Sequence, residues 1–387
     1  MKEPIIYFDH AAATPVDPLV VEAMRPFWSD DFYNPSAGYA PAVLVKRQYM
    51  DAKSRIGRVI GAKADEIIMT AGATESVNLA FTAAGEGKSM VGAVEHSSVL
   101  ACAKKRGDVI IVGANRRGRI DPAEVKRLLT PEVSFLSIAL ANHELGTIQD
   151  ISEIAKIVNQ ERLRRQQAGE ELPIVFHTDA SQAATLIDIK PNRLGVDLMT
   201  LSAAKTYGPK QVGLLWAKPG VKLSANIVGG GQESGLRSGT ENVAGVVGFA
   251  VALELAASRR SAEVKRLNNL RNFMLGELKS NFPDLVVSTD LKKSLANFLN
   301  VSFPGIDAER LVFILEKQNV LVATGSACAA NAGTASTVLK AIGLSDDEIN
   351  GSLRLTLGRM SDQQTVAEGV KAIIEAVKLE RSRTNDS

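Results

Sequence analysis

The chain has 387 residues, of which 45% are hydrophobic and 23% are charged, and its formal net charge at pH 7 is +2. This composition is typical of a globular protein with two or three domains. The low net charge, with Lys and Arg scattered along the chain, argues against a nucleic-acid surface, and no apolar run reaches the ~18 residues of a membrane span. Two cysteines, Cys102 and Cys328, cannot form a disulfide framework. We therefore expect a cytoplasmic protein with no nucleic-acid partner, no membrane partner and no bound metal.

Short β-rich apolar runs alternate with helical patterns over the first half of the chain. Such alternation predicts an α/β fold with a mainly parallel sheet, covered by helices on both faces, that binds ligands at the carboxyl ends of its strands. The predicted strands are residues 5–8, 66–70, 90–94, 109–112, 133–139, 174–177, 198–201 and 212–216, and the predicted helices are residues 20–27, 42–60, 77–81, 97–105, 122–129 and 151–168.

Polar residues follow four of these predicted strands. The most informative is Lys205, which lies between small residues and a Gly-Pro turn. Lysine is rarely buried without a partner or a covalent role, and a lysine that forms a Schiff base needs a rigid, partly desolvated position. A solvated lysine before a turn is the alternative. Because parallel strands end at one edge of a sheet, we expect four positions to lie near one another: His96, residues 142–144, Asp179 and Lys205.

A turn of small residues, 71–76, follows the predicted strand 66–70 and leads into a helix. Gly72 would let the backbone approach a ligand closely, and Thr74 and Ser76 carry hydroxyl groups. A strand, a small-residue turn and a helix N-terminus together form a favourable anion site. The pattern fits a phosphate site or a simple capping turn.

A glycine-rich loop, residues 229–242, precedes a predicted apolar helix at 243–255. Such loops can be plain linkers. The presence of Arg237, Ser238 and Thr240 at the entrance to the helix favours a phosphate contact instead.

The last third of the chain predicts a second, smaller α+β unit. We expect a large domain of residues 16–258 and a small domain made of residues 1–15 and 259–387. A charged helix at 261–278 bridges the two, followed by strands at 298–303, 320–323 and 352–357 and by helices at 308–317, 336–342 and 364–379.

The motifs, taken in chain order, form a recognisable set. Asp179-Ala180-Ser181-Gln182 is followed by Ser202-x-x-Lys205, and further motifs cover the whole length. Together they resemble the pyridoxal-phosphate (PLP) enzymes of the class V aminotransferase family, fold type I, and within it the cysteine desulfurases. The further motifs are Tyr7-Phe8-Asp9-x-Ala11-Ala12-x-Thr14-Pro15, Asn34-Pro35-Ser36, Gly72-Ala73-Thr74-Glu75-Ser76-x-Asn78-Leu79-Ala80, Glu95-His96, Gly229-Gly230-Gly231-Gln232-Glu233, Arg237-Ser238-Gly239-Thr240-Glu241-Asn242, Ser326-Ala327-Cys328 and Arg354-Leu355-Thr356-Leu357-Gly358-Arg359.

The resemblance implies PLP as the cofactor and a role for each matching residue. Lys205 would hold the cofactor covalently and move protons, while Asp179 would keep its pyridine nitrogen protonated and Gln182 would bind its ring hydroxyl. His96 would stack on the ring and act as an acid or base, and Arg354 would bind the substrate carboxylate. A site shared across two subunits implies a homodimer. The expected phosphate contacts are Ala73, Thr74, Ser202 and, from the neighbouring subunit, Thr240; the expected substrate contacts include Asn142 and His143.

Cys328 separates a desulfurase from an ordinary aminotransferase. It lies in a run of tiny residues, 324–333, which we interpret as a mobile loop that brings a thiol to the cofactor. The resemblance implies that its thiolate attacks the substrate sulfur, which leaves a Cys328 persulfide and releases alanine. The alternative is a small buried hydrophobic residue, which we favour for Cys102.

Five positions depart from the pattern of the family. Ala204 replaces the usual histidine before the lysine, and His143 replaces the second residue of Asn-Asn-Glu. Loss of a charge-assisted phosphate contact would weaken cofactor retention by roughly 1 to 3 kcal/mol. His10 and His143 would alter substrate choice or the proton path, unless these changes are neutral drift. The remaining departures are Tyr39 and Ser234, which replace a histidine and an arginine.

The sequence therefore predicts a PLP-dependent cysteine desulfurase that converts L-cysteine to L-alanine and passes sulfur to an acceptor protein, such as an iron–sulfur scaffold or a thiolation protein. One alternative is an enzyme of the same fold that acts on selenocysteine or cystine or performs transamination, and dependence on Cys328 separates the two. The other alternative is a regulatory or scaffold protein with little activity, which the absorbance of bound cofactor would test.

Overall fold

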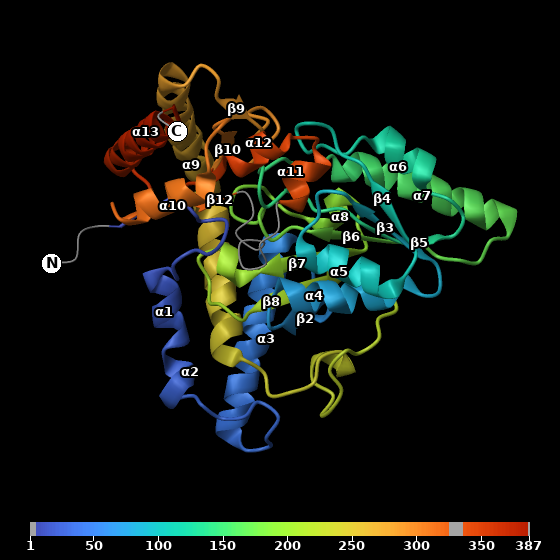
Figure 1. Cartoon of the computed structure of the whole chain (residues 1–387). Coiled ribbons are helices and arrows are strands. Elements are labelled where there is room, and N and C mark those ends of the chain that lie inside the picture. The colour runs from blue at the N-terminus through green and yellow to red at the C-terminus, as the bar shows by residue number, and fades with distance from the viewer. Residues whose placement is uncertain (1–4, 325–335, 386–387) are drawn as a thin grey trace.

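A computed structural model describes residues 5–324 and 336–385 of the chain. Its larger sheet has seven strands: β2 (Ile67–Thr70), β3 (Lys88–Gly92), β4 (Val109–Val112), β5 (Val133–Ser137), β6 (Val175–Asp179), β7 (Leu198–Ser202) and β8 (Gly213–Ala217). They lie in the order β2-β8-β7-β6-β5-β3-β4 (Figure 1). β8 runs antiparallel to its two neighbours, β2 and β7, and every other pair of adjacent strands in this sheet is parallel. The predicted α/β fold with a mainly parallel sheet is confirmed.

The two faces of this sheet pack against different helices, because successive side chains of a strand point to opposite sides. Ile67 and Met69 belong to one core, whereas Ile68 belongs to another. A strand buried on both faces is apolar throughout, which explains the short continuous apolar runs in the sequence. The first core includes α3 (Ala40–Ile60), α6 (Pro122–Leu128), α7 (Ile151–Ala168) and the first half of α9 (Val243–Asn281), and the second includes α4 (Ala73–Phe81) and α5 (Ser97–Arg106).

A second, antiparallel sheet has four strands: β9 (Val286–Val287), β10 (Phe298–Ser302), β12 (Ala323–Thr324) and β13 (Ser352–Thr356). Their order is β12-β13-β10-β9. Leu299 and Leu353 lie on its apolar face, in a core with the second half of α9, α10 (Ala308–Glu316) and α13 (Gln363–Asn385). The side chains of Asn300 and Arg354 alternate with these residues and lie on the opposite, polar face, which is also buried.

Two short helices follow the residues that the structure leaves undescribed. These are α11 (Thr337–Ala341) and α12 (Asp346–Asn350). Val338 and Leu339 of α11 pack against Val94 and Leu145, which follow strands of the larger sheet. This contact joins the two sheets on the side where the parallel strands end.

The N-terminal residues connect the two sheets. β1 (Ile6–Tyr7) pairs in parallel with β11 (Val320–Leu321), and Phe8 belongs to the core of the smaller sheet. Asp9 then bridges to Thr356 at the end of β13. Residues 10–17 therefore leave the smaller sheet and run towards the larger one, ahead of α1 (Pro18–Met24) and α2 (Pro26–Ser29).

Two predicted helices were wrong in their limits. The helices predicted at 243–255 and 261–278 form the single helix α9, because residues 256–260 contain no glycine or proline to end it. Figure 1 shows α9 passing from α3 to the C-terminal helix α13. The domain boundary predicted at 258/259 falls inside this helix and stays a prediction.

Two smaller differences concern one predicted helix and one predicted strand. The helix predicted at 20–27 is divided into α1 and α2 at Pro26, since proline lacks the N–H that a continuous helix needs. The strand predicted at 320–323 is divided between β11 and β12, which pair with different partners. Within residues 5–324 and 336–385, no helix combines the length and apolar character that crossing a membrane requires.

Candidate active site

Lys205 lies just after β7, at the edge where the parallel strands of the larger sheet end. Its Nζ donates hydrogen bonds to the carbonyl oxygens of Ala11 (2.8 Å) and Ala12 (2.6 Å). The backbone N–H and the hydroxyl of Thr14 both donate to the carbonyl oxygen of Ala204 (3.2 and 3.0 Å). The N-terminal segment is thus bound both to the lysine head group and to the backbone beside it.

Asp179, Gln182 and His96 lie at the same edge of the sheet. Gln182 Nε2 donates to the Ala11 carbonyl oxygen (3.1 Å), which also accepts from Lys205. Asp179 is the last residue of β6, and its charge and that of Lys205 act on His96 in opposite directions. The structure therefore brings together Lys205, Asp179 and His96, which sequence analysis placed at separate strand ends, and places Gln182 beside them.

His96 is held in one orientation at the start of α5. Its Nδ1 lies 3.2 Å from the backbone N of Ser98 and 2.8 Å from the hydroxyl of that residue. Since the N–H can only donate, Nδ1 accepts, and the proton of the neutral ring lies on Nε2. Burial lowers the pKa of His96, more than the nearby Asp179 carboxylate raises it. At neutral pH the ring is uncharged.

His143 packs edge-on against His96, with ring centroids 5.0 Å apart and planes at 73°. Burial holds its pKa well below the ordinary value, and the neighbouring charges of Arg354 and Lys205 act in the same direction. Its Nε2 lies 3.7 Å from Oε1 of Glu144. Burial raises the pKa of Glu144 to about 7, although the hydroxyl of Ser336 donates to Oε2 (2.6 Å). Two uncharged imidazoles and a titratable carboxyl group therefore adjoin one another.

Arg354 extends from β13 towards these histidines. Its Nη2 donates to Oδ1 of Asp9 (2.7 Å), and its Nη1 donates to the carbonyl oxygen of His143 (3.1 Å). Sequence analysis gave Asp9 no role, although the motif that contains it was noted. A guanidinium has five N–H donors in a planar fork, so these two bonds leave donors for a substrate carboxylate.

Asn142 is buried, and its amide group binds the backbone. Nδ2 donates to the carbonyl oxygen of Val94 (2.8 Å), while Oδ1 accepts from the N–H groups of Glu144 (2.8 Å) and Leu145 (2.7 Å). These bonds shape the loop that presents His143. A direct contact between Asn142 and a substrate stays a prediction.

The small-residue turn after β2 forms the N-terminus of α4. This helix begins at Ala73, four residues earlier than predicted, so its first N–H groups have no partner within the helix. Gly72 has a φ of 152°, and a Cβ there would meet nothing within 4 Å. On the other side, a Cβ on Gly213 would lie 2.6 Å from Gly72 Cα, and Gly213 pairs with Ser202. Thr74, Ala73 and Ser202 are thereby grouped at one helix N-terminus, as expected for an anion site.

Thr240 lies elsewhere on the same chain. It lines a cavity together with Thr70, Ala71 and Arg237, and Arg237 forms an ion pair with Glu75 of α4 (3.0 Å). The glycine-rich loop therefore packs behind the start of α4. A contact from Thr240 to the site of a neighbouring subunit stays a prediction.

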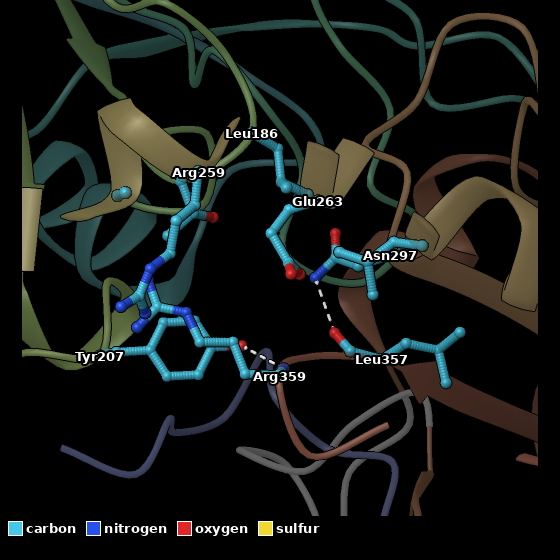
Figure 2. A pocket seen from close by; sticks show the side chains of 10 residues that line it. Leu186, Tyr207, Arg259, Glu263, Asn297, Leu357 and Arg359 are labelled. Carbon is cyan, nitrogen blue, oxygen red and sulfur yellow. Dashed lines mark hydrogen bonds between the residues drawn. The ribbon is translucent and has the colours of Figure 1, made fainter. Parts of the chain in front are cut away.

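Figure 2 shows how the turn after Lys205 is supported. Tyr207 has a φ of 60°, an uncommon value for a residue with a side chain. Its ring packs 3.9 Å from the guanidinium of Arg359, whose backbone N–H donates to the tyrosine Oη (2.8 Å). Asp17 donates its N–H to the Tyr207 carbonyl oxygen (2.9 Å), and its carboxylate accepts from Arg359 (2.7 Å) and Arg259 (2.9 Å). These contacts hold the turn that follows Lys205.

Comparison with known proteins identifies the family. The profile described as aminotransferase class-V matches residues 6–368. The chain belongs to the class-V aminotransferase family. It is 38% identical to the cysteine desulfurase IscS of Dictyoglomus turgidum, over 91% of this chain and 89% of that protein. A solved NifS-like protein superposes with a TM-score of 0.88 at 31% identity, covering 97% of this chain and 100% of that one. The structure of SspA in complex with cysteine has a TM-score of 0.76 at 31% identity, covering 91% and 98%. The predicted fold type I architecture is confirmed.

The positions that depart from the family pattern lie in different surroundings. Ala204 touches the N-terminal segment through its carbonyl oxygen, whereas Tyr39 and Ser234 are exposed. His10 is buried, its Nδ1 lies 3.1 Å from the Thr356 carbonyl oxygen, and burial lowers its pKa to about 4. The predicted nucleophile Cys328 lies outside the described residues.

The histidines predict how stability depends on pH. All four have a pKa below the ordinary value of 6.5 because they are buried: His10, His96, His143 and His177. Between pH 6.5 and 4 these histidines therefore bind fewer protons in the folded protein than in the unfolded chain, so their contribution to the free energy of unfolding falls as pH is lowered through this window. For His10 alone the loss is about 3 kcal/mol.

We expect His10→Asn to flatten this dependence. Urea unfolding of both proteins at pH 7, 6, 5 and 4 should give a difference in unfolding free energy that shifts by about 3 kcal/mol in favour of the variant towards pH 4. Parallel curves would show that His10 is not buried in its neutral form.

Proposed function

We propose that this protein is a PLP-dependent cysteine desulfurase, which converts L-cysteine to L-alanine and holds the sulfur as a persulfide on Cys328 for transfer to an acceptor protein in iron–sulfur cluster assembly or thiolation. The observation that carries the proposal is the meeting of Lys205, Asp179 and His96, at the edge of the larger sheet, with Arg354 of the smaller sheet, in a chain similar to desulfurases over nearly its whole length.

The residues at this edge fit PLP. The N-terminus of α4, with open space at Gly72, suits a phosphate dianion. The Asp179 carboxylate suits a protonated pyridine nitrogen, and the amino group of Lys205 suits the aldehyde. When bound, PLP would supply an electron sink for negative charge that develops on the substrate.

The other side chains would bind the substrate and move protons. Arg354 would bind the α-carboxylate with the donors that Asp9 and the His143 carbonyl leave available. His96 would exchange a proton through Nε2, because Ser98 already holds Nδ1. Since burial keeps both His96 and His143 uncharged at neutral pH, His96 would act first as a proton donor through Nε2.

The sulfur step would use Cys328. Its thiolate attacks the substrate sulfur, so that an S–S bond forms while the Cβ–S bond of the substrate breaks. The electron pair of the broken bond remains on Cβ, which takes up a proton to become the methyl group of alanine. The balance is one cysteine and one enzyme thiol converted to one alanine and one enzyme persulfide.

We expect Cys328→Ala to lose activity by at least about 100-fold, as for removal of a covalent nucleophile. Wild type, given L-cysteine and a reductant, should release alanine and sulfide in equal amounts. Cys102→Ala is the matched control, because Cys102 is buried on α5 and should be dispensable. Undiminished alanine release from the Cys328 variant would exclude this nucleophile, and release of a keto acid would instead indicate transamination.

A homodimer is the second part of the proposal. Large apolar side chains are exposed on α2, the loop after it and α3, which lie together in Figure 1. Phe32 stacks on Tyr33 (4.6 Å between centroids), which contacts Tyr39 (6.0 Å). Phe32 is 65% exposed and Trp28 is 60% exposed. Large apolar side chains exposed near one another are typical of an interaction surface, and a second copy of the chain would also bring Thr240 to the neighbouring site.

Charge placed on this surface should separate the subunits. We expect Phe32→Glu to give a monomer by size-exclusion chromatography with light scattering. Phe313→Glu is the matched control. Phe313 is 66% exposed on α10, a helix that packs against the smaller sheet, so this variant should remain dimeric. A Phe32→Glu protein that stays dimeric would place the interface elsewhere.

A further inference from the structure

The polar face of the smaller sheet carries a row of residues that includes Arg354. Asn300 of β10 pairs directly with Arg354 of β13. On the other side of β10, the N–H of Ser288 donates to the Asn300 carbonyl oxygen (3.0 Å), one residue beyond the pair Val287–Val301. Directly paired residues of antiparallel strands point to the same face, so Ser288, Asn300 and Arg354 lie side by side.

Each residue of this row has a buried polar atom without a hydrogen-bond partner among the described residues. The atoms are Ser288 Oγ, Asn300 Nδ2 and Arg354 Nε, and the next row adds Ser302 Oγ. Asn300 is 0% exposed, and Arg354 is 5% exposed. Unsatisfied buried groups are uncommon in native proteins, and here the residues that carry them are neighbours on a single face of the sheet.

The chemistry of these atoms is complementary to water. Nε–H and Nδ2–H can only donate, so they cannot bind each other. The hydroxyl of Ser352 donates to Asn300 Oδ1 (3.5 Å), which leaves the NH₂ group as the free end of the amide. A water molecule between them accepts from both N–H groups and donates to the hydroxyl oxygen of Ser288, which gives it three partners.

We infer that Asn300 is a positioning residue for Arg354 and acts through buried water on the polar face of the smaller sheet. Asp9 and the His143 carbonyl hold the two Nη atoms of the guanidinium. The water bound by Asn300 holds Nε, so all three nitrogens are fixed and the plane of the fork is set before the substrate binds. This inference rests on the proposed function, in which Arg354 binds the α-carboxylate.

Asn300→Leu tests the inference, because leucine has a similar volume and no polar atoms. We expect the KM for L-cysteine to rise about 3- to 10-fold, the range that corresponds to one hydrogen bond, with kcat within twofold of wild type. The KM for L-cysteine methyl ester, which lacks the carboxylate, should not change. Ser302→Ala is the matched control, since Ser302 pairs with Ser352 rather than Arg354, and its KM should stay within twofold.

A binding measurement separates this inference from the proposed activity. The Kd of L-alanine, followed through the absorbance of the PLP-loaded protein, requires no turnover and should rise by the same factor in Asn300→Leu. If wild type binds L-alanine but releases no sulfide, the desulfurase proposal fails while this comparison still decides the role of Asn300.

A second variant covers the case in which Asn300→Leu does not fold. Asn300→Asp keeps the size of the side chain and puts a carboxylate beside Arg354, so it should raise both the KM for L-cysteine and the Kd of L-alanine more than Asn300→Leu does. The inference is overturned if the folded variants keep both constants within twofold of wild type, if the methyl ester is affected equally, or if Ser302→Ala matches Asn300→Leu.

Discussion

The hydrogen bonds from Lys205 Nζ to the carbonyl oxygens of Ala11 and Ala12 are the contact on which the site depends. They exist because β1 anchors the N-terminus beside β11 of the smaller unit, after which the chain crosses to the end of the larger sheet. The same short segment supplies Asp9 to Arg354 and Asp17 to Arg359. This N-terminal segment therefore fixes Lys205 of the larger sheet relative to Arg354 of the smaller sheet. Neither sheet alone determines the distance between these two side chains.

Local pattern was sufficient to predict most elements of the larger sheet. In β4, for example, the apolar run and the observed strand coincide at Val109–Val112, because contacts with other elements do not change where this strand begins and ends. The predicted limits were wrong where pairing with a distant strand determines where an element begins or ends. Nothing local distinguishes residues 320–321 from 323–324, because their division into β11 and β12 depends on two partners distant in sequence. Similarly, the change in composition near residue 258 marks a change of the core that α9 packs against, which sequence analysis interpreted as a break in the helix.

The residues of the site also fall into those that local pattern predicts and those that depend on contacts distant in sequence. Lys205, Asp179 and His96 were predictable because the ends of parallel strands meet by geometry, and Gly72 because few residues suit a close approach to a helix N-terminus. Asp9 was not, since its importance comes from a contact with Arg354, 345 residues away. The family resemblance assigned Asn142 a place near the substrate, but it could not show that backbone groups occupy its amide oxygen. A motif identifies which residues matter more reliably than it identifies which atoms are available.

The electrostatic balance explains how this site tolerates an extra histidine. Lys205 and Arg354 supply two positive charges, and Asp179 and Asp9 supply two negative charges. At neutral pH the remaining titratable groups add less charge than they would in water: burial lowers the pKa of His96 and His143, raises the pKa of Glu95 to about 8, and raises the pKa of Glu144 to about 7, which leaves Glu144 only partly ionised. His143 therefore enters as a neutral polar ring, as an asparagine would. In the proposed function, the unmatched negative charge would arrive with the cofactor phosphate and the substrate carboxylate, whose proposed sites are the start of α4 and Arg354. A positively charged His143 would upset this balance by competing with Arg354 for the carboxylate. The burial that keeps the His143 ring uncharged therefore matters more than the replacement of asparagine by histidine.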